Sequence, residues 1–136
     1  MNYLDSLYWI HERSKFGIKP GVKRMEWMLE QFNNPQDKIR GIHVGGTNGK
    51  GSTVAYLRTA LVENGYDVGT FTSPFIESFN ERISLNGTPI TNDEIVDLVE
   101  RVKPVSEALE NETELGGATE FEIITTMMFL YFGEIH

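Results

Sequence analysis

The stretch Gly45-Gly46-Thr47-Asn48-Gly49-Lys50-Gly51-Ser52 decides how the rest of the sequence is interpreted. It follows residues 39–44, whose alternating apolar pattern predicts a strand, and it leads into residues 52–63, whose composition predicts a helix. A glycine-rich turn between a strand and a helix is the setting of a phosphate-binding loop. In such a loop, successive backbone N–H groups and the positive end of the helix dipole face the anion. The sequence therefore predicts a nucleotide phosphate site at this turn.

Side chains in and after the turn supply the groups that phosphate chemistry needs. Lys50 is a mobile positive charge for the β- and γ-phosphates, and Ser52 or Thr53 offers a hydroxyl to a phosphate or to Mg²⁺. The spacing departs from the usual G-x-x-x-x-G-K-[ST] pattern, because Val44 takes the place of the first glycine and Gly51 directly follows Lys50. The alternative is a structural turn with an incidental lysine. The succession of strand, loop and helix favours the phosphate site.

The elements around the turn predict an α/β fold with a parallel sheet. A second strand is expected at residues 68–72, so that strand, turn, helix and strand form a βαβ unit with a right-handed crossover. Residues 73–82 are expected to form a loop, and Asn86-Gly87 predicts a small hairpin. Further helices are expected at residues 4–18, 22–32, 91 to about 101 with a break or kink near Pro104, and 121–132. The last of these is apolar on all sides and must be largely buried.

Composition and charge exclude several classes of protein. A length of 136 residues predicts about one domain, and 40% hydrophobic with 24% charged residues is typical of a globular chain. The net charge of −8 divides into +4 over residues 1–60 and −12 over residues 61–136. Such an acidic chain is a poor candidate for non-specific nucleic-acid binding, so no nucleic-acid partner is expected. The basic half can still receive a small phosphorylated ligand.

Signals for export or membrane insertion are missing from the sequence. It has no cysteine, and no apolar run approaches the roughly 18 residues of a membrane helix. Its first residues do not show the basic segment followed by an apolar stretch that marks a signal peptide. We therefore expect a soluble cytoplasmic protein without a membrane partner. The three histidines do not have the spacing of metal ligands.

Three separate motifs resemble one enzyme family. The first is the GTNGKGS loop itself, and a pair of predicted helices stands before it. The second is TSPFI at residues 72–76, followed by FNERI at residues 79–83. The third is TEFE at residues 119–122. Together they are similar to the folylpolyglutamate synthases and their bifunctional dihydrofolate synthase relatives, in the Mur ligase superfamily.

This resemblance implies an ATP-dependent ligase that adds L-glutamate to a folate or to dihydropteroate. An acyl phosphate on the folate carboxylate is implied as the intermediate, with Mg²⁺ assisting the phosphoryl transfer. Lys50 is the implied catalytic cation. The other implied site residues are Asn48, Gly49, Gly51, Ser52 and Thr53 for ATP, Ser73 for Mg²⁺, and Phe75, Arg82, Glu120 and Phe121 for the folate. Phe75 is equally suited to be a core anchor, and Thr119 with Glu122 is also explained as a helix capping box.

The family's enzymes are considerably longer than 136 residues. The resemblance therefore implies that residues 1–136 are the N-terminal part of a truncated ATP-binding domain, without its second Mg²⁺ ligand or the C-terminal domain. The full-length enzyme is expected to be monomeric. Residues 1–136 alone are expected to form no amide product. They are also expected either to self-associate through an unpaired sheet edge or to melt with reduced cooperativity.

Three other functions stay open at this stage, and one of them is a binding or structural role without chemistry. A non-ligase nucleotide-binding module, such as a small kinase, usually places Ser or Thr directly after the lysine, where this chain has Gly51. A peptidoglycan Mur ligase resembles GTNGKT instead and carries a further domain before the loop, for which 44 residues are too few. The sequence does not separate folylpolyglutamate synthase from dihydrofolate synthase activity, and it does not give the preferred folate.

Overall fold

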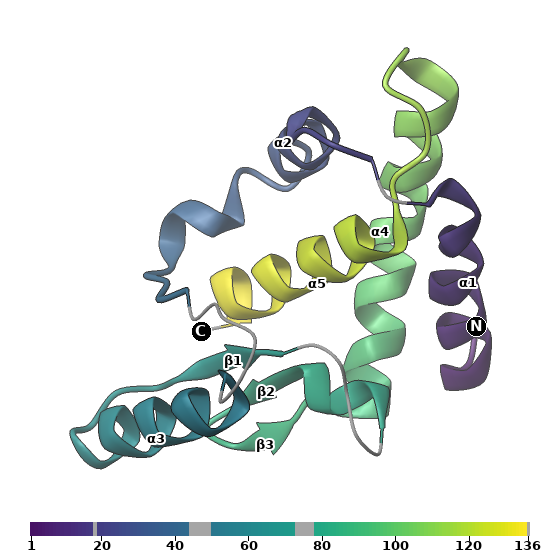
Figure 1. Ribbon diagram of the computed structural model, residues 1–136. Helices are drawn as coiled ribbons and strands as arrows, with labels where there is room; N and C mark the ends of the chain where they lie inside the picture. The colour runs from purple at the N-terminus through teal and green to yellow at the C-terminus, as the bar shows by residue number, and fades with distance from the viewer. Residues whose placement is uncertain (18, 44–49, 73–77, 136) are drawn as a thin grey trace. The chain divides into compact units, whose positions relative to one another are not determined.

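The computed structural model describes residues 1–17, 19–43, 50–72 and 78–135, with the side chains of residues 50–52 and 135 left out (Figure 1). The chain divides into two compact units. The helical unit contains Met1–Ile39 and Asp93–His136, and the sheet unit contains Arg40–Asn92.

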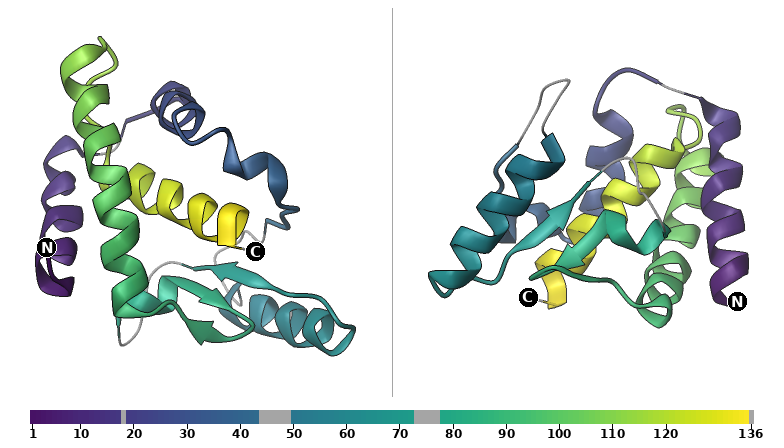
Figure 2. Two further views of the ribbon diagram at one scale, coloured as in Figure 1. Left: turned by 180° about the vertical axis from the view of Figure 1, so that it is seen from behind. Right: turned by 60° about the horizontal axis from the view of Figure 1, so that its bottom comes forward.

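The helical unit is built around its most apolar helix, α5 (Glu120–Ile135), which runs through its middle (Figures 1 and 2). This helix packs against α1, α2 and the two 3-10 helices η1 and η2. The other elements are α1 (Tyr3–Glu12), η1 (Arg13–Phe16), α2 (Lys23–Glu30), η2 (Pro35–Lys38) and α4 (Asn92–Glu112). The expected burial of the last helix is confirmed, because its side chains Ile123, Ile124, Met127 and Leu130 are inaccessible to solvent.

Polar contacts tie the long helix α4 to α5. Glu94 hydrogen-bonds the Tyr131 hydroxyl, and burial together with this carboxylate raises the pKa of Tyr131. Arg101 forms an ion pair with Glu134 near the other end of α5. Gly117, before α5, lies so near Phe16 that a Cβ atom there would come within 2.3 Å of the ring. A larger residue at this position would require the Phe16 ring to move.

The described residues of the sheet unit form one helix, a short 3-10 helix and three short strands. They are α3 (Lys50–Glu63), β1 (Gly69–Phe71), η3 (Phe79–Arg82), β2 (Ile83–Leu85) and β3 (Thr88–Pro89). The strands form an antiparallel sheet in the order β1-β2-β3, with Phe71 opposite Ile83 and Leu85 opposite Thr88. The α/β class is therefore confirmed.

The hairpin predicted at Asn86-Gly87 is confirmed between β2 and β3. Both residues have positive φ, 50° and 85°, as a type I′ turn requires. The Asn86 side chain also accepts a hydrogen bond from the Val68 backbone N–H at 2.7 Å and donates one to the Asp67 carboxylate at 3.1 Å. This single residue therefore joins the turn to the segment that leads into β1.

Parallel pairing is not found in the part of the chain that the structure describes. Residues 39–43 belong to no strand, and residue 44 lies outside the described residues. The described partner of β1 is β2, which runs antiparallel. Alternation of apolar residues is not sufficient for a strand, because the backbone N–H and C=O groups must also find a partner strand. The predictions of a strand over residues 39–43 and of its parallel pairing in a βαβ unit are therefore corrected.

Two other boundaries differ from expectation. Helix α4 does not break near Pro104 but continues to Glu112, because a proline removes only one backbone donor while the buried face of Leu98, Val102 and Leu109 runs past it. The predicted loop at residues 73–82 contains a 3-10 helix at its end, closed by a capping box between Ser78 and Glu81.

The turn residue Asn86 gives a stability prediction. Asn86→Ala removes the side-chain hydrogen bonds that help asparagine to adopt positive φ at this position. We therefore expect the free energy of unfolding to fall by about 1–2 kcal/mol. Urea denaturation of the chain measures this change. Asp67→Ala is the matched control, since it removes only the exposed contact to Asn86 and should cost less than about 0.5 kcal/mol. Equal losses in the two variants would contradict the role of the turn.

Candidate functional site

The first group of predicted site residues lies at the start of α3. This 14-residue helix begins at Lys50, directly after the glycine-rich stretch, and Thr53 is exposed in its first turn. Asn48 and Gly49 lie outside the described residues. Backbone N–H groups at a helix N-terminus, an ammonium group and two hydroxyls are together the donor set that suits a triphosphate with Mg²⁺. The residues present at this position therefore fit the predicted ligand by their chemistry.

Of the residues predicted after the second strand, only Arg82 is described. Ser73 and Phe75 lie outside the described residues. Arg82 ends η3, where its guanidinium lies 5.8 Å from the centre of the Phe79 ring. Its neighbour Asn80 is buried and donates to the Ile90 carbonyl at 2.7 Å and to the Asn92 side chain at 2.9 Å. In the FNERI motif, Asn80 thus stabilises the sheet unit, and Arg82 is the residue predicted to contact the ligand.

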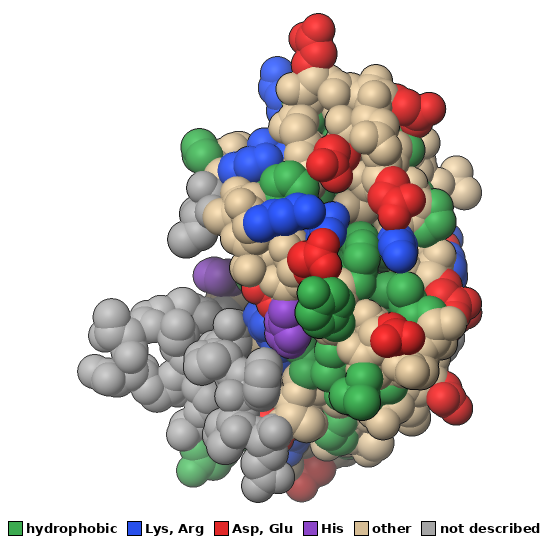
Figure 3. Space-filling model, turned by 90° about the vertical axis from the view of Figure 1, so that its right-hand side faces the viewer, with side chains coloured by type: hydrophobic (Ala, Val, Ile, Leu, Met, Phe, Trp, Pro, Cys, Tyr) green, Lys and Arg blue, Asp and Glu red, His purple; other side chains and the backbone are tan. Residues whose placement is uncertain are grey.

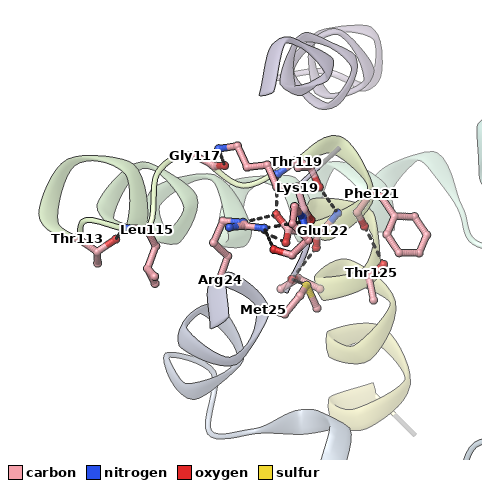
Figure 4. A network of polar contacts seen from close by, with 12 residues as sticks. Lys19, Arg24, Met25, Thr113, Leu115, Gly117, Thr119, Phe121, Glu122 and Thr125 are labelled. Carbon is pink, nitrogen blue, oxygen red and sulfur yellow. Dashed lines mark hydrogen bonds and ion pairs between the residues drawn. The ribbon is translucent and has the colours of Figure 1, made fainter. Parts of the chain in front are cut away.

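The second group lies in the helical unit, at the first turn of α5. The predicted capping box is confirmed: the Thr119 N–H donates to Glu122 Oε1 at 2.9 Å, and the Glu122 N–H donates to Thr119 Oγ1 at 3.2 Å. Glu122 is more than nine-tenths buried, and its carboxylate accepts from Arg24 Nε at 2.9 and 3.1 Å (Figure 4). This cap is therefore also one half of a buried ion pair.

Arg24 also donates to the segment before α2. Its Nη2 atom donates to the carbonyls of Lys19 and Pro20, at 3.3 and 3.2 Å. Lys19 in turn donates to the Gly117 carbonyl at 2.9 Å (Figure 4). One ion pair and its hydrogen bonds therefore fix three segments: the loop before α2, α2 itself and the start of α5.

A pocket of about 530 Å³ lies where these segments meet. Phe121 stands at it with 58% of its surface exposed, which is unusual for a phenylalanine. The lining is largely apolar and has one ammonium group, that of Lys19. Its residues are Gly17, Lys19, Gly21, Val22, Met25, Thr119, Phe121, Glu122 and Thr125. Such a pocket suits a flat apolar or aromatic group.

The structure gives the predicted residue Glu120 a protein partner. Its Oε1 atom lies 2.6 Å from His11 Nδ1, at the end of α1. Of the predicted folate residues, Phe121 lines the pocket and Glu120 directly precedes it in the chain. Lys50, Thr53 and Arg82 belong to the sheet unit. Among the described residues, no group of three His, Asp or Glu side chains is placed to hold a metal ion.

Sequence reasoning did not assign four residues of this region to a site: Lys19, Val22, Arg24 and Met25. Arg24 and Glu122 are 98 positions apart, so no local pattern connects them. The one available signal was the charge of Arg24 on the apolar helix of residues 22–32, since a charge on such a face needs a partner.

Comparison with known proteins gives matches over almost the whole chain. A dihydrofolate synthase/folylpolyglutamate synthase of Bacillus subtilis (strain 168) is 57% identical over 134 residues, which are 98% of this chain and 31% of that protein. The folylpolyglutamate synthetase structure from Lactobacillus casei has a TM-score of 0.89 at 38% identity and covers 97% of this chain and 33% of that one. A complex named FPGS–AMPPCP–folate has a TM-score of 0.85 at 36% identity, with coverages of 97% and 32%.

This chain thus spans about a third of the length of the relatives it matches. No family model matches it. Within the described ranges, no helix has the length and hydropathy that crossing a membrane requires.

The buried ion pair gives the second prediction. Arg24→Ala leaves the Glu122 carboxylate buried without its cation, so we expect a loss of about 3–5 kcal/mol in the free energy of unfolding. Lys15→Ala is the control, because it breaks an exposed pair with Glu12 at 3.7 Å and should cost at most about 1 kcal/mol. Chemical denaturation of both variants makes the comparison. Similar small losses would show that the buried pair does not hold this region together.

Proposed function

This chain is homologous over almost all of its length to the folylpolyglutamate/dihydrofolate synthase family, and we propose that it supplies the N-terminal part of the ATP-binding domain of such a synthase. The complete enzyme is then an ATP-dependent ligase that adds L-glutamate to a folate, or to dihydropteroate to make dihydrofolate. The identity of 57% over 134 residues is the observation that carries this proposal.

The chemistry of amide formation explains why a phosphate loop belongs in such an enzyme. A carboxylate is a poor acyl donor, because it is anionic and would have to expel oxide. When bound with Mg²⁺, ATP supplies the phosphoryl group that turns the folate carboxylate into an acyl phosphate. The glutamate amine then displaces phosphate, and the amide forms. In this scheme the chain's own task is to hold the triphosphate and to neutralise its charge.

Lys50 and the hydroxyl groups near it are assigned to that task. Lys50 neutralises charge that develops on the phosphoryl group, and the hydroxyls of Ser52 and Thr53 bind phosphate oxygens or the metal ion. Ser73 is assigned as a ligand of Mg²⁺. The position of Lys50 at the first residue of α3 supports the first assignment, since the positive end of the helix adds to its charge. The FPGS–AMPPCP–folate complex of the comparison supports both a nucleotide and a folate as ligands.

The folate ring is assigned to the pocket beside Phe121. A flat heteroaromatic ring can stack on the exposed phenylalanine ring, while Val22 and Met25 provide an apolar floor. Lys19 offers a hydrogen-bond donor to a ring oxygen or nitrogen. Arg82 and Phe75 stay proposed folate contacts, as does Glu120. The expectations that residues 1–136 alone are inactive and self-associate also stay predictions.

The catalytic assignment of Lys50 is tested in a full-length synthase that contains this segment. Lys50→Ala removes the charge that stabilises the transferring phosphoryl group, so we expect kcat for amide formation to fall at least about tenfold. The assay follows phosphate release and folate–glutamate product together. Arg58→Ala is the control, since it removes another positive charge from α3 and should leave turnover near normal. A fully active Lys50→Ala enzyme would exclude the phosphate-loop assignment.

The metal assignment of Ser73 has its own signature. Ser73→Ala should raise the Mg²⁺ concentration for half-maximal rate, because one oxygen ligand is lost, while the KM for the folate stays nearly unchanged. Titrating Mg²⁺ at saturating ATP measures this. Ser73→Thr keeps the hydroxyl and should keep the Mg²⁺ requirement. If the alanine variant has an unshifted Mg²⁺ dependence, Ser73 is not a metal ligand.

A further inference from the structure

The contact between His11 and Glu120 joins two segments that are 109 positions apart in the sequence. His11 lies near the end of α1, and Glu120 is the first residue of α5. The Nδ1–Oε1 distance of 2.6 Å is that of a strong, charge-assisted hydrogen bond. Both side chains are only partly buried, with 49% and 29% of their surfaces exposed. The contact therefore adds little to a hydrophobic core, and its value must lie in where it holds the chain.

What it holds is the turn that presents Phe121. Successive residues of an α-helix are about 100° apart around the axis, so the side chains of residues 120 and 122 leave the helix on either side of residue 121. Glu120 reaches His11 on α1, and Glu122 reaches Arg24 on α2. Phe121 lies between these two anchors, with its ring at the pocket.

The start of a helix depends on such contacts more than its interior does. The first N–H groups of a helix have no partner within the helix, so its first turn frays more easily than the turns that follow. The capping box and Arg24 fix one side of this turn. A second contact on the other side limits the fraying, with which the Phe121 ring would move. His11 is placed to supply that contact.

We propose that His11 is a positioning residue which, through Glu120, holds the Phe121 ring in the orientation on which the folate ring stacks. This inference rests on the proposed function, because it assigns a task to the pocket named there. It predicts an effect on folate binding that is transmitted through Phe121. It predicts no effect on ATP binding, on glutamate binding or on the chemical step.

The test is a double-mutant cycle in a full-length synthase that contains this segment. His11→Ala should raise the KM for the folate by about threefold to fivefold, the range of an exposed ion pair, and leave kcat and the KM for ATP unchanged. Phe121→Ala should raise the folate KM further. Because His11 acts through Phe121, the double variant should be no worse than Phe121→Ala alone. Additive effects, or an equal rise in the KM for ATP, would overturn the proposal.

Two further variants separate positioning from simple loss of stability. In His11→Asn, the amide nitrogen takes the place of Nδ1 as a donor to Glu120, so the folate KM should return toward that of the unmodified enzyme. Lys15→Ala removes the exposed ion pair between Lys15, in η1, and Glu12, at the end of α1. This variant should leave the folate KM unchanged. A folate KM in His11→Asn as high as in His11→Ala would overturn the proposal.

The outcome also distinguishes this inference from the proposed function. If Phe121→Ala raises the folate KM and His11→Ala does not, the pocket assignment stands and the positioning role is wrong. If Phe121→Ala leaves the folate KM unchanged, both the pocket assignment and the positioning role are wrong.

Discussion

A guanidinium and a carboxylate that are both removed from water hold together the segments of the helical unit that meet at its apolar pocket. Burying two charges costs several kcal/mol for each ion, and their attraction offsets this only if the other donors and acceptors also find partners. Here several of them do. Glu122 accepts from both Arg24 and the Thr119 N–H, while Arg24 also donates to two carbonyls before α2. The pocket thus owes its shape to a hydrogen-bonded polar network and not to apolar packing alone.

This network explains how a very apolar helix acquires a polar, well-defined beginning. The side chains that follow in α5, such as Ile123, Ile124 and Met127, would pack in many similar ways, because apolar contacts have no direction. Hydrogen bonds and ion pairs do have a direction, and they occur at residues 119, 120 and 122. The result is one exposed aromatic ring between fixed neighbours, which is the arrangement that a stacking ligand needs.

Local sequence signals predicted the features whose cause is local. The Asn86-Gly87 hairpin, the Thr119–Glu122 capping box and the burial of α5 all depend on residues within a few positions of each other, and the structure confirms them. The strand expected at residues 39–44 depends on a distant partner, and residues 39–43 form none. The partners of Glu122 and Glu120 are likewise distant, so the resemblance pointed to Glu120 and Phe121 but not to the residues that surround them. The phosphate loop was predicted from residues 45–52, of which residues 45–49 lie outside the described part of the chain.

The close approach of Gly117 to Phe16 has a consequence for reading sequence variation in this protein. The same phenylalanine ring lies 4.9 Å from the Lys19 ammonium, and that ammonium donates to the Gly117 carbonyl. A methyl group at position 117 would displace the ring, and the displaced ring would move the one ammonium group that lines the pocket. A substitution that looks like a matter of backbone space would therefore change the electrostatic potential felt by a bound ligand. In a collection of natural variants, glycine at 117 should accordingly be inherited together with the aromatic residue at 16 and the cation at 19.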